Sequence, residues 1–212
     1  MAHYRKPLAA AVGLNTAIVI VEAVAGLQAN SLSLLIDSVH NVSDEMALVC
    51  LFVAFFLSGA PSKHLLRSAN LLNSLGLIVM SAVLVWEASA RLWHPTPMTG
   101  LVPVVIGLAA AIGNWGVARL LWAPGTHNAA IRLAYVHNLG DVGVSCAPVL
   151  AGLLVTLSGQ VVFDPLAAGC VAVWLMWSTL RELVGTHDVL LWPEEAVCGH
   201  PVDTHTGAQQ AT

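Results

Sequence analysis

Long apolar runs separated by short polar breaks make up most of the chain. A helix needs about 20 residues to cross a hydrocarbon core of roughly 30 Å, and six of the runs are about that long. The predicted spans are Pro7–Ala29, Leu32–Leu57, Leu71–Trp93, Leu101–Trp122, Ala129–Leu157 and Leu166–Val184. Because the breaks are short, we expect an all-α protein of six transmembrane helices, with no soluble domain between consecutive helices.

The composition supports the same fold class. Hydrophobic residues occupy 57% of the 212 positions and charged residues only 9%, whereas soluble domains contain about one quarter charged residues. We therefore predict an integral, multi-pass membrane protein whose helices contact the lipid bilayer. The formal net charge of −4 argues against a nucleic-acid partner, because nucleic acids attract basic proteins.

The basic residues predict the orientation of the chain. If both termini are cytoplasmic, seven of the eight lysines and arginines lie at the inner surface and only Arg91 lies outside. The seven are Arg5, Lys6, Lys63, Arg67, Arg119, Arg132 and Arg181. An excess of positive charge on the cytoplasmic side is typical of membrane proteins. We therefore expect both termini in the cytoplasm and the chain in the inner (plasma) membrane of the cell.

The second predicted span contains an unusual set of polar residues, within the stretch SLLIDSVHNVSDEMALV at positions 33–49. Asp37, His40, Asn41 and Asp44 are separated by three or four residues, which places them on one face of a helix. An acid at the centre of a membrane helix costs about 2.5–3.5 kcal/mol on insertion scales, and such acids are usually functional. This polar stripe is therefore a candidate functional site.

The fifth predicted span repeats part of this pattern, since HNVSD begins at position 40 and HNLGD at position 137. At a rise of about 1.5 Å per residue, the two histidine–aspartate pairs reach the middle of the bilayer from opposite sides. Two imidazoles and two carboxylates at one depth can form a tetrahedral N2O2 shell for Zn2+. We therefore predict a metal site made by His40, Asp44, His137 and Asp141.

Several other polar residues carry expectations of their own. Asn15 and Glu22 share one face of the first span, where they either bond a neighbouring helix or line the ion path. The role of Asp37, one turn from His40, is open, although we expect it not to bind metal directly. Asp164 precedes a proline at the start of the sixth span, which predicts an N-cap for that helix.

Neutral residues near the site are expected to shape the packing of the helices. Gly140 and Gly143 should leave the fifth helix slender on one side, so that another backbone can come close. Asn73 and Asn114 are expected to form hydrogen bonds between helices. Glu45 follows Asp44 in the sequence and is expected to point away from the polar stripe.

These motifs resemble the cation diffusion facilitators, a family of zinc transporters. The likeness covers LNTAIVIVEAVAGLQANSLSLLIDSVHNVSD in the first two spans, VWEASARLWHPTP closing the third, AYVHNLGDVGVS in the fifth and FDPLAAGCVAVWLMWSTLREL in the sixth. The resemblance implies a six-helix transmembrane domain with a transport site made by the second and fifth helices. It implies metal ligands at His40, Asp44, His137 and Asp141.

The chain also departs from that family. Typical members continue after the sixth helix into a cytosolic domain that binds metal and holds a dimer, whereas 28 residues follow Val184 here. We expect a cation-efflux transmembrane domain at residues 1–185 and a short, flexible cytoplasmic tail at residues 186–212. A homodimer would then use the transmembrane helices. The tail contains four candidate zinc ligands whose role is open, namely Cys198, His200, Asp203 and His205.

The ligand chemistry predicts an exchange of metal for protons. Imidazoles bind metal when neutral and carboxylates when ionised, so metal binding releases protons. Histidine, with an ordinary pKa of about 6.5, changes its charge in the physiological range. We predict a transporter and not an enzyme, which exports a divalent cation in exchange for protons as the site opens to each side in turn. Zn2+ is the expected cargo, Cd2+ or Co2+ could replace it, and no resident cofactor is expected.

Two interpretations from other classes remain open at this point. An intramembrane metallohydrolase would also place histidine and aspartate around zinc, but it needs an open coordination position and a general base. Glu45 is the nearest candidate base. A bis-histidine haem protein would place His40 and His137 on facing helices, and would leave Asp44 and Asp141 without a role.

Overall fold

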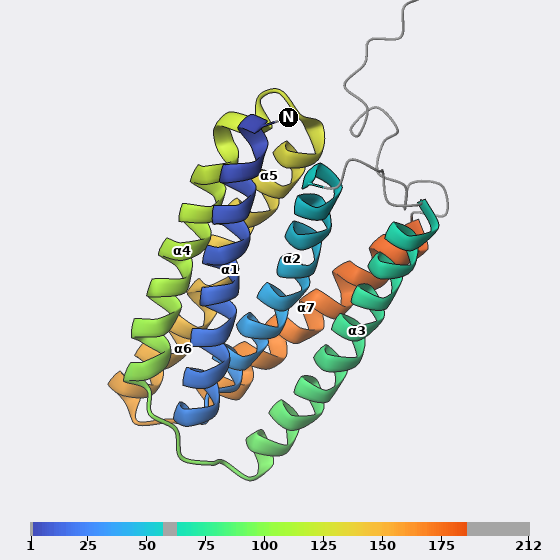
Figure 1. Cartoon of the computed structure of the whole chain (residues 1–212). Coiled ribbons are helices and arrows are strands. Elements are labelled where there is room, and N and C mark those ends of the chain that lie inside the picture. Colours follow the sequence, from blue (N-terminus) through green and yellow to red (C-terminus); the bar gives the residue numbers. More distant parts are fainter. Residues whose placement is uncertain (1, 57–62, 186–212) are drawn as a thin grey trace, which may run out of the picture.

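The computed structural model describes residues 2–56 and 63–185, and every regular element in these ranges is a helix (Figure 1). The helices are α1 (Ala2–Ala29), α2 (Leu32–Phe56), α3 (Lys63–Trp93), α4 (Leu101–Gly125), α5 (Ala129–Val144), α6 (Cys146–Ser158) and α7 (Phe163–Gly185). The all-α prediction is confirmed. The six predicted spans correspond to these helices, with the fifth span divided between α5 and α6.

Most of the helices are suited to a bilayer. Five stretches of the described chain are long and apolar enough to cross a membrane: Arg5–Ala29, Leu71–Trp93, Leu101–Gly125, Ile131–Ser158 and Phe163–Arg181. The remaining long helix, α2, has 25 residues and carries three acids, Asp37, Asp44 and Glu45. Large apolar side chains such as Trp86 and Leu157 are exposed on the outside of the bundle. The chain is therefore a multi-pass integral membrane protein.

The fifth span is interrupted at Ser145, which lies between α5 and α6. The predicted span Ala129–Leu157 is confirmed as one membrane-spanning stretch at Ile131–Ser158, and Pro148 gives the physical reason for the break inside it. A proline has no N–H group, so it leaves the carbonyl of Val144, four residues earlier, without its helical partner. The Ser145 N–H still donates to the Asp141 carbonyl at 2.9 Å, so the two helices follow one another across the bundle.

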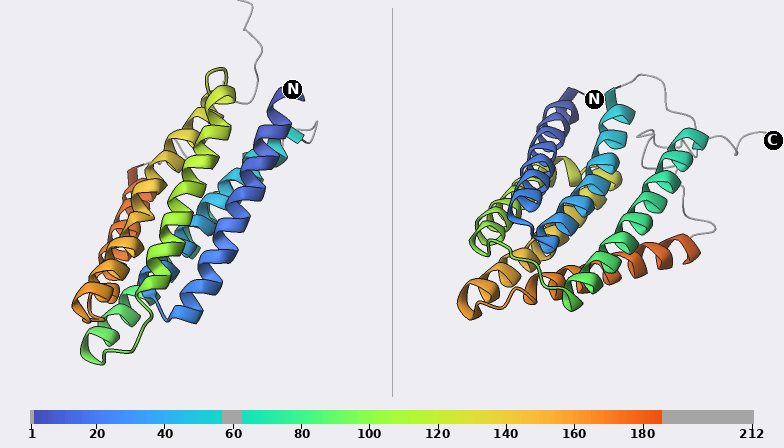
Figure 2. Two further views of the ribbon diagram at one scale, coloured as in Figure 1. Left: turned by 90° about the vertical axis from the view of Figure 1, so that its left-hand side faces the viewer. Right: turned by 90° about the horizontal axis from the view of Figure 1, so that it is seen from below.

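Apolar side chains form two separate clusters, and α2 contributes to both. The first joins α1, α2, α4 and α5 and comprises Leu8, Ala11, Ile18, Leu48, Leu51, Ala110, Val117, Leu121 and Ile131. The second joins α2, α3 and α7 and comprises Leu32, Ile36, Leu84, Ala88, Ala168, Ala172 and Leu175. Figures 1 and 2 show α3 and α7 on one side of α2, and α1 and α4 on the other. The polar stripe of α2 lies between the two clusters along the helix.

The topology places basic residues of distant segments at one end of the bundle. α1 and α5 begin and α4 ends at the level of the N-terminus (Figure 1), and these helix ends carry Arg5, Arg132 and Arg119. Arg91 lies near the end of α3, at the opposite level. Which side of the membrane each end faces stays a prediction. The predicted tail, residues 186–212, lies outside the described residues together with its candidate zinc ligands.

Asp164 links the start of α7 to the start of α2. Its carboxylate accepts hydrogen bonds from the hydroxyls of Ser31 and Ser33 at 2.7 and 2.6 Å, and from the N–H groups of Leu32 and Ser33 at 2.6 and 3.2 Å. These N–H groups belong to the first turn of α2, where helices need outside acceptors. The prediction that Asp164 caps its own helix was therefore wrong, because α7 already begins at Phe163.

Close helix packing occurs at glycines other than the predicted ones. A Cβ added at Gly140 or Gly143 would meet no atom within 4 Å, so the predicted approach of another backbone to that face of α5 was wrong. At Gly107 of α4, in contrast, a Cβ would lie 2.9 Å from Val149 and 3.1 Å from Pro148 of α6. The small residue is needed where α4 crosses α6, while the glycine face of α5 remains open.

Candidate metal centre

The polar stripe of α2 is buried inside the helix bundle. Asp37, His40, Asn41 and Asp44 are exposed by only 1%, 5%, 0% and 4%. Leucine, isoleucine and valine occupy most of the other positions of this part of α2. The helical spacing thus turns all four polar side chains inward, as the sequence predicts.

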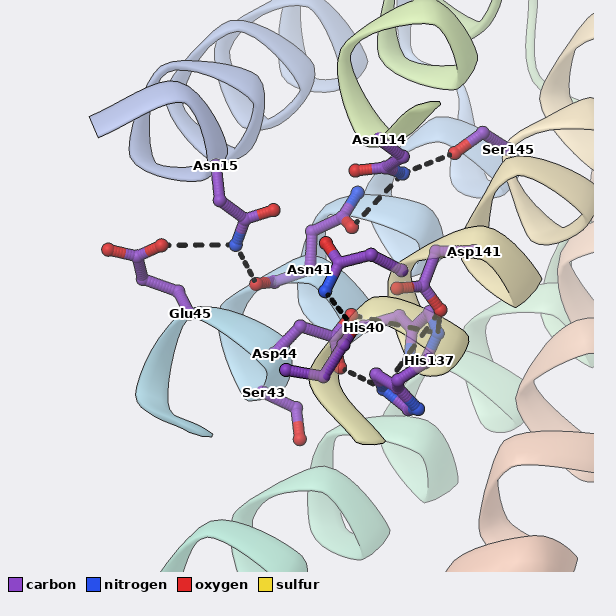
Figure 3. A network of polar contacts seen from close by, with 12 residues as sticks. Asn15, His40, Asn41, Ser43, Asp44, Glu45, Asn114, His137, Asp141 and Ser145 are labelled. Atoms are coloured by element: carbon purple, nitrogen blue, oxygen red, sulfur yellow. Dashed lines mark hydrogen bonds and ion pairs between the residues drawn. The ribbon is translucent and has the colours of Figure 1, made fainter. Parts of the chain in front are cut away.

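The two histidine–aspartate pairs meet across α2 and α5 (Figure 3). Each histidine contacts the aspartate of the other helix: the His40 Nε2 atom lies 3.1 Å from the Asp141 Oδ1 atom, and the His137 Nε2 atom lies 2.6 Å from the Asp44 Oδ1 atom. Within each helix the corresponding separations are 3.8 Å on α2 and 4.0 Å on α5. One potential ligand atom from each side chain lies within 4.8 Å of those of the other three.

These separations suit a small tetrahedral ion. Ligands roughly 2.0 Å from a zinc ion at the corners of a tetrahedron lie about 3.3 Å from one another. The observed distances of 2.6 to 4.0 Å fall on both sides of that value, so small side-chain rotations would bring all four atoms onto one ion. The donor set of two nitrogens and two carboxylate oxygens is one that Zn2+ accepts.

The candidate site combines buried acids with one accessible histidine. The side chain of His137 is 52% exposed, whereas those of His40, Asp44 and Asp141 are exposed by 7% or less. Three polar atoms of the buried side chains have no hydrogen-bond partner, namely Asp44 Oδ2, Asp141 Oδ2 and His40 Nδ1. Buried oxygen and nitrogen atoms are therefore free to bind an ion, and an ion can reach them past His137.

Helix α1 holds α2 through hydrogen bonds beside the site. The Asn15 amide donates to the Asn41 carbonyl at 3.2 Å and to the Glu45 carboxylate at 3.1 Å, and the Thr16 hydroxyl donates to Glu45 at 2.6 Å. Glu45 thus points toward α1 and away from the stripe, as expected. Of the two roles considered for Asn15, the structure shows the hydrogen bonding between helices.

Helix α4 holds the interrupted fifth span in the same way. The Asn114 amide donates to the Ser145 hydroxyl at 3.1 Å and lies 3.5 Å from the Asn41 side-chain oxygen (Figure 3). The predicted bonding role of Asn114 is confirmed, and so is that of Asn73, whose amide donates to the Ser43 hydroxyl at 2.8 Å. Sequence reasoning did not single out Ser145. The proline three residues later was the available signal, because it predicts a break next to a hydroxyl that can bond across it.

The fold and the site together define a class: a multi-pass helical membrane protein that gathers ionisable side chains inside its bundle, as proteins that move ions across membranes do. Residues 8–191 match the cation efflux transmembrane domain family. Because the match covers most of the chain, the chain belongs to this family. The resemblance to cation diffusion facilitators is thereby confirmed.

Several curated bacterial proteins are similar to the chain. The zinc transporter ZitB of Pectobacterium atrosepticum is 29% identical over 198 residues, which cover 87% of this chain and 61% of ZitB. ZitB of Escherichia coli is 30% identical over 190 residues, covering 85% and 61%. A cadmium, cobalt and zinc/H(+)-K(+) antiporter of Bacillus velezensis is 32% identical over 176 residues, covering 77% and 55%. The chain thus spans 55% to 61% of the length of these relatives.

The site and the family both argue against the two rival interpretations. The base considered for a metallohydrolase, Glu45, is bonded to α1 and directed away from the histidines. A haem held by the Nε2 atoms of His40 and His137 would leave the buried carboxylates of Asp141 and Asp44, which these atoms face, without partners. Membership of a cation efflux family favours transport over both.

Proposed function

We propose that the chain is a divalent cation transporter, with zinc as its main substrate, that exports the metal from the cytoplasm across the plasma membrane in exchange for protons. The observation that supports this most is the convergence of His40, Asp44, His137 and Asp141 from two helices within 4.8 Å. These four residues are the proposed ligands of the transported ion. The names of the similar proteins, which include zinc transporters and a cadmium, cobalt and zinc antiporter, point to the same substrate class.

The contacts between the four side chains suggest how metal and protons exchange. Without metal, a proton on either histidine can be shared with the carboxylate it faces, at 3.1 Å for His40 and 2.6 Å for His137. A divalent ion replaces these bonds with coordination and needs both imidazoles neutral, so it displaces the protons. Protons arriving from the other side reverse the step and expel the ion.

The choice of metal follows only in part from the donors. A tetrahedral N2O2 shell suits Zn2+, and Co2+ or Cd2+ can occupy the same donors. Zinc occurs in the names of the three similar proteins, and cadmium and cobalt occur in that of the Bacillus velezensis antiporter. We therefore expect zinc to be transported best and cadmium and cobalt more weakly. We expect no hydrolytic activity, and any homodimer to form through the transmembrane helices.

The test is metal flux in proteoliposomes. The chain is reconstituted with equal zinc on both sides of the vesicle membrane and the interior is then made acidic. Protons leaving the vesicle should drive zinc inward, so that zinc accumulates above equilibrium. The same vesicles are tested with cadmium, cobalt, magnesium and calcium to rank the ions.

Three controls make the result decisive. Vesicles without protein report leakage, and His137→Ala, which removes an accessible ligand, should show no flux at the same reconstitution level. A protonophore that dissipates the pH gradient should abolish accumulation in the wild type. Downhill zinc flux without any accumulation under the gradient would rule out antiport and leave facilitated diffusion. Equal flux in the wild type and His137→Ala would instead contradict the proposed site.

A further inference from the structure

A second pair of buried acids lies next to the candidate metal site and is not part of it. Glu22 comes from α1 and Asp37 from α2, and their side chains are exposed by 0% and 1%. Neither is among the four residues whose ligand atoms converge. The acids therefore need a separate explanation.

The contacts of this pair are incomplete. The Asn41 amide donates to Glu22 Oε2 at 2.7 Å, while Glu22 Oε1 and both carboxylate oxygens of Asp37 have no hydrogen-bond partner. Asn41 lies one helical turn from Asp37 on α2, so the bond from Asn41 brings Glu22 to the same face as Asp37. The two carboxyl groups are close enough to act on each other electrostatically.

Among the described residues, no lysine or arginine compensates the charge of the pair, and His40, a cation only when protonated, faces Asp141 at 3.1 Å. The ionisable groups that act on Asp37 are Glu22, His40 of α2 and Asp141 of α5, and on Glu22 only Asp37 acts. Helix α4 also packs against α1. Its one ionisable residue, Arg119, is exposed and lies near the C-terminal end of α4. Two adjacent carboxylates without a cation are strongly disfavoured in an apolar interior, where like charges repel and solvation is lost. One of the two must hold a cation, and a proton is the smallest.

We propose that Glu22 and Asp37 together hold one proton in the metal-free protein and release it when a divalent cation binds to the four-residue site. In the metal-free state the proton is bonded to a carboxylate oxygen of Glu22 and donated to Asp37. On release that O–H bond breaks, the proton passes to water, and both carboxylates are ionised. The dication in the neighbouring site supplies the compensating charge.

The position of Asp37 explains why the two sites would be coupled. It lies one turn from His40 on the same buried face of α2, and it interacts electrostatically with His40 and Asp141. The ion adds a charge of +2 less any protons that it displaces from His40 and His137, so the added charge is largest where the histidines are already neutral. This charge acts on Asp37 from one helical turn away, in a medium of low dielectric constant where such effects are large. The presence of a proton on the pair in the metal-free protein is inferred from the burial of both acids and their unpartnered oxygens. Its release on metal binding rests on the proposed function.

Infrared spectroscopy tests the resting proton without any transport. Zinc-free protein in lipid vesicles at neutral pH should show the carbonyl stretch of a protonated carboxylic acid, shifted in D2O. The band should be lost in Glu22→Gln and retained in Glu87→Gln, which changes a partly exposed acid paired with Arg91. A wild-type spectrum without the band would overturn the proposal, whether or not the variants fold. A band that appears only when potassium is replaced by a large organic cation would show that the pair binds potassium instead.

Calorimetry tests the coupling. Zinc titrations in buffers of different ionisation enthalpy give the number of protons released per zinc bound. This number should fall by up to about one in Glu22→Gln. Zinc affinity should change by no more than about tenfold, the smallest effect typical of residues that act on the metal through a ligand. An unchanged proton count in a folded Glu22→Gln protein would overturn the release step. If the wild type binds no zinc, the proposed function fails while the infrared result still decides the resting proton.

Discussion

The candidate metal site and the Glu22–Asp37 pair share one face of α2 but differ in how their charges are satisfied. In the candidate metal site, each carboxylate faces a histidine of the other helix, at 3.1 and 2.6 Å, and His137 is half exposed. In the acid pair, both side chains are buried and three of the four carboxylate oxygens lack a partner. The first arrangement is accessible past His137, whereas the second is fully buried and suits a small ion such as a proton.

This difference shows why acids of the same helix need not have the same role. Asp44 and Asp37 are seven residues apart on α2 and equally buried, yet only Asp44 faces an imidazole of α5. Carboxylates with nitrogen donors beside them suit a transition metal. Carboxylates that face each other beside neutral hydrogen-bond donors, here the Asn41 amide, suit a proton. Substitutions that remove one kind of acid and not the other separate the two roles.

The largest effect is expected from substitution of the four proposed ligands. Replacing His40, Asp44, His137 or Asp141 by alanine should remove one ligand of the proposed tetrahedral shell. Loss of a residue that only hydrogen-bonds to a metal ligand weakens metal binding by roughly 10- to 100-fold. Loss of a ligand itself should weaken zinc binding by more than that. Isothermal titration of the purified variants, with helix content checked by circular dichroism, measures this. Wild-type affinity in any of the four would remove that residue from the site.

The second prediction concerns pH. Both histidines must lose their protons to bind metal, so zinc affinity should fall as the pH is lowered through the ordinary histidine pKa of about 6.5. The two histidine protons contribute a fall that approaches about 100-fold per pH unit below that range. Above it the histidines contribute no slope, and a remaining slope of up to about tenfold per pH unit would report the proton released by Glu22 and Asp37. Zinc titrations between mildly acidic and mildly alkaline buffers measure the slope. A slope near zero would show that no proton leaves the site on binding.

The third prediction separates the acid pair from the metal site. Asp37→Asn keeps the shape of the side chain but removes its charge, so zinc affinity should stay within about tenfold of the wild type, while transport is slowed. Affinity by titration and flux in proteoliposomes are measured on the same preparation. A complete loss of zinc binding would make Asp37 a ligand and erase the distinction between the two groups of acids.

The fourth and smallest effect on binding is expected from an acid outside both groups. Asp164→Ala removes the acceptor of the N–H groups and hydroxyls at the start of α2, and each bond to a charged group contributes about 1.5–3 kcal/mol. Thermal unfolding of the purified protein should show a lower Tm, with zinc affinity nearly unchanged. Glu87→Gln is the control, because its ion pair with Arg91 is partly exposed, and ion pairs that reach solvent contribute about 1 kcal/mol or less. Equal Tm values for both variants would contradict the anchoring role of Asp164.

The sequence predicted the parts of this protein that depend on local pattern. Six apolar runs predicted the spans, and helical spacing predicted that Asp37, His40 and Asp44 share a buried face. The repeated H-N-x-x-D motif predicted that two histidine–aspartate pairs meet, and the meeting of the four side chains is seen in the structure. These predictions succeed because the lipid core fixes helix length and depth, and two motifs at equal depth can be compared without knowing the packing.

Other features were decided only by the tertiary structure, because they depend on which helices become neighbours. The acceptor for the start of α2 comes from Asp164, more than 130 positions later in the chain. The bond from Asn41 that places Glu22 beside the face of Asp37, and the open side of α5 at Gly140, follow from helix rotation. Spacing along one helix determines which side chains share a face, but the partner of that face is set by packing between helices, and no local pattern encodes it.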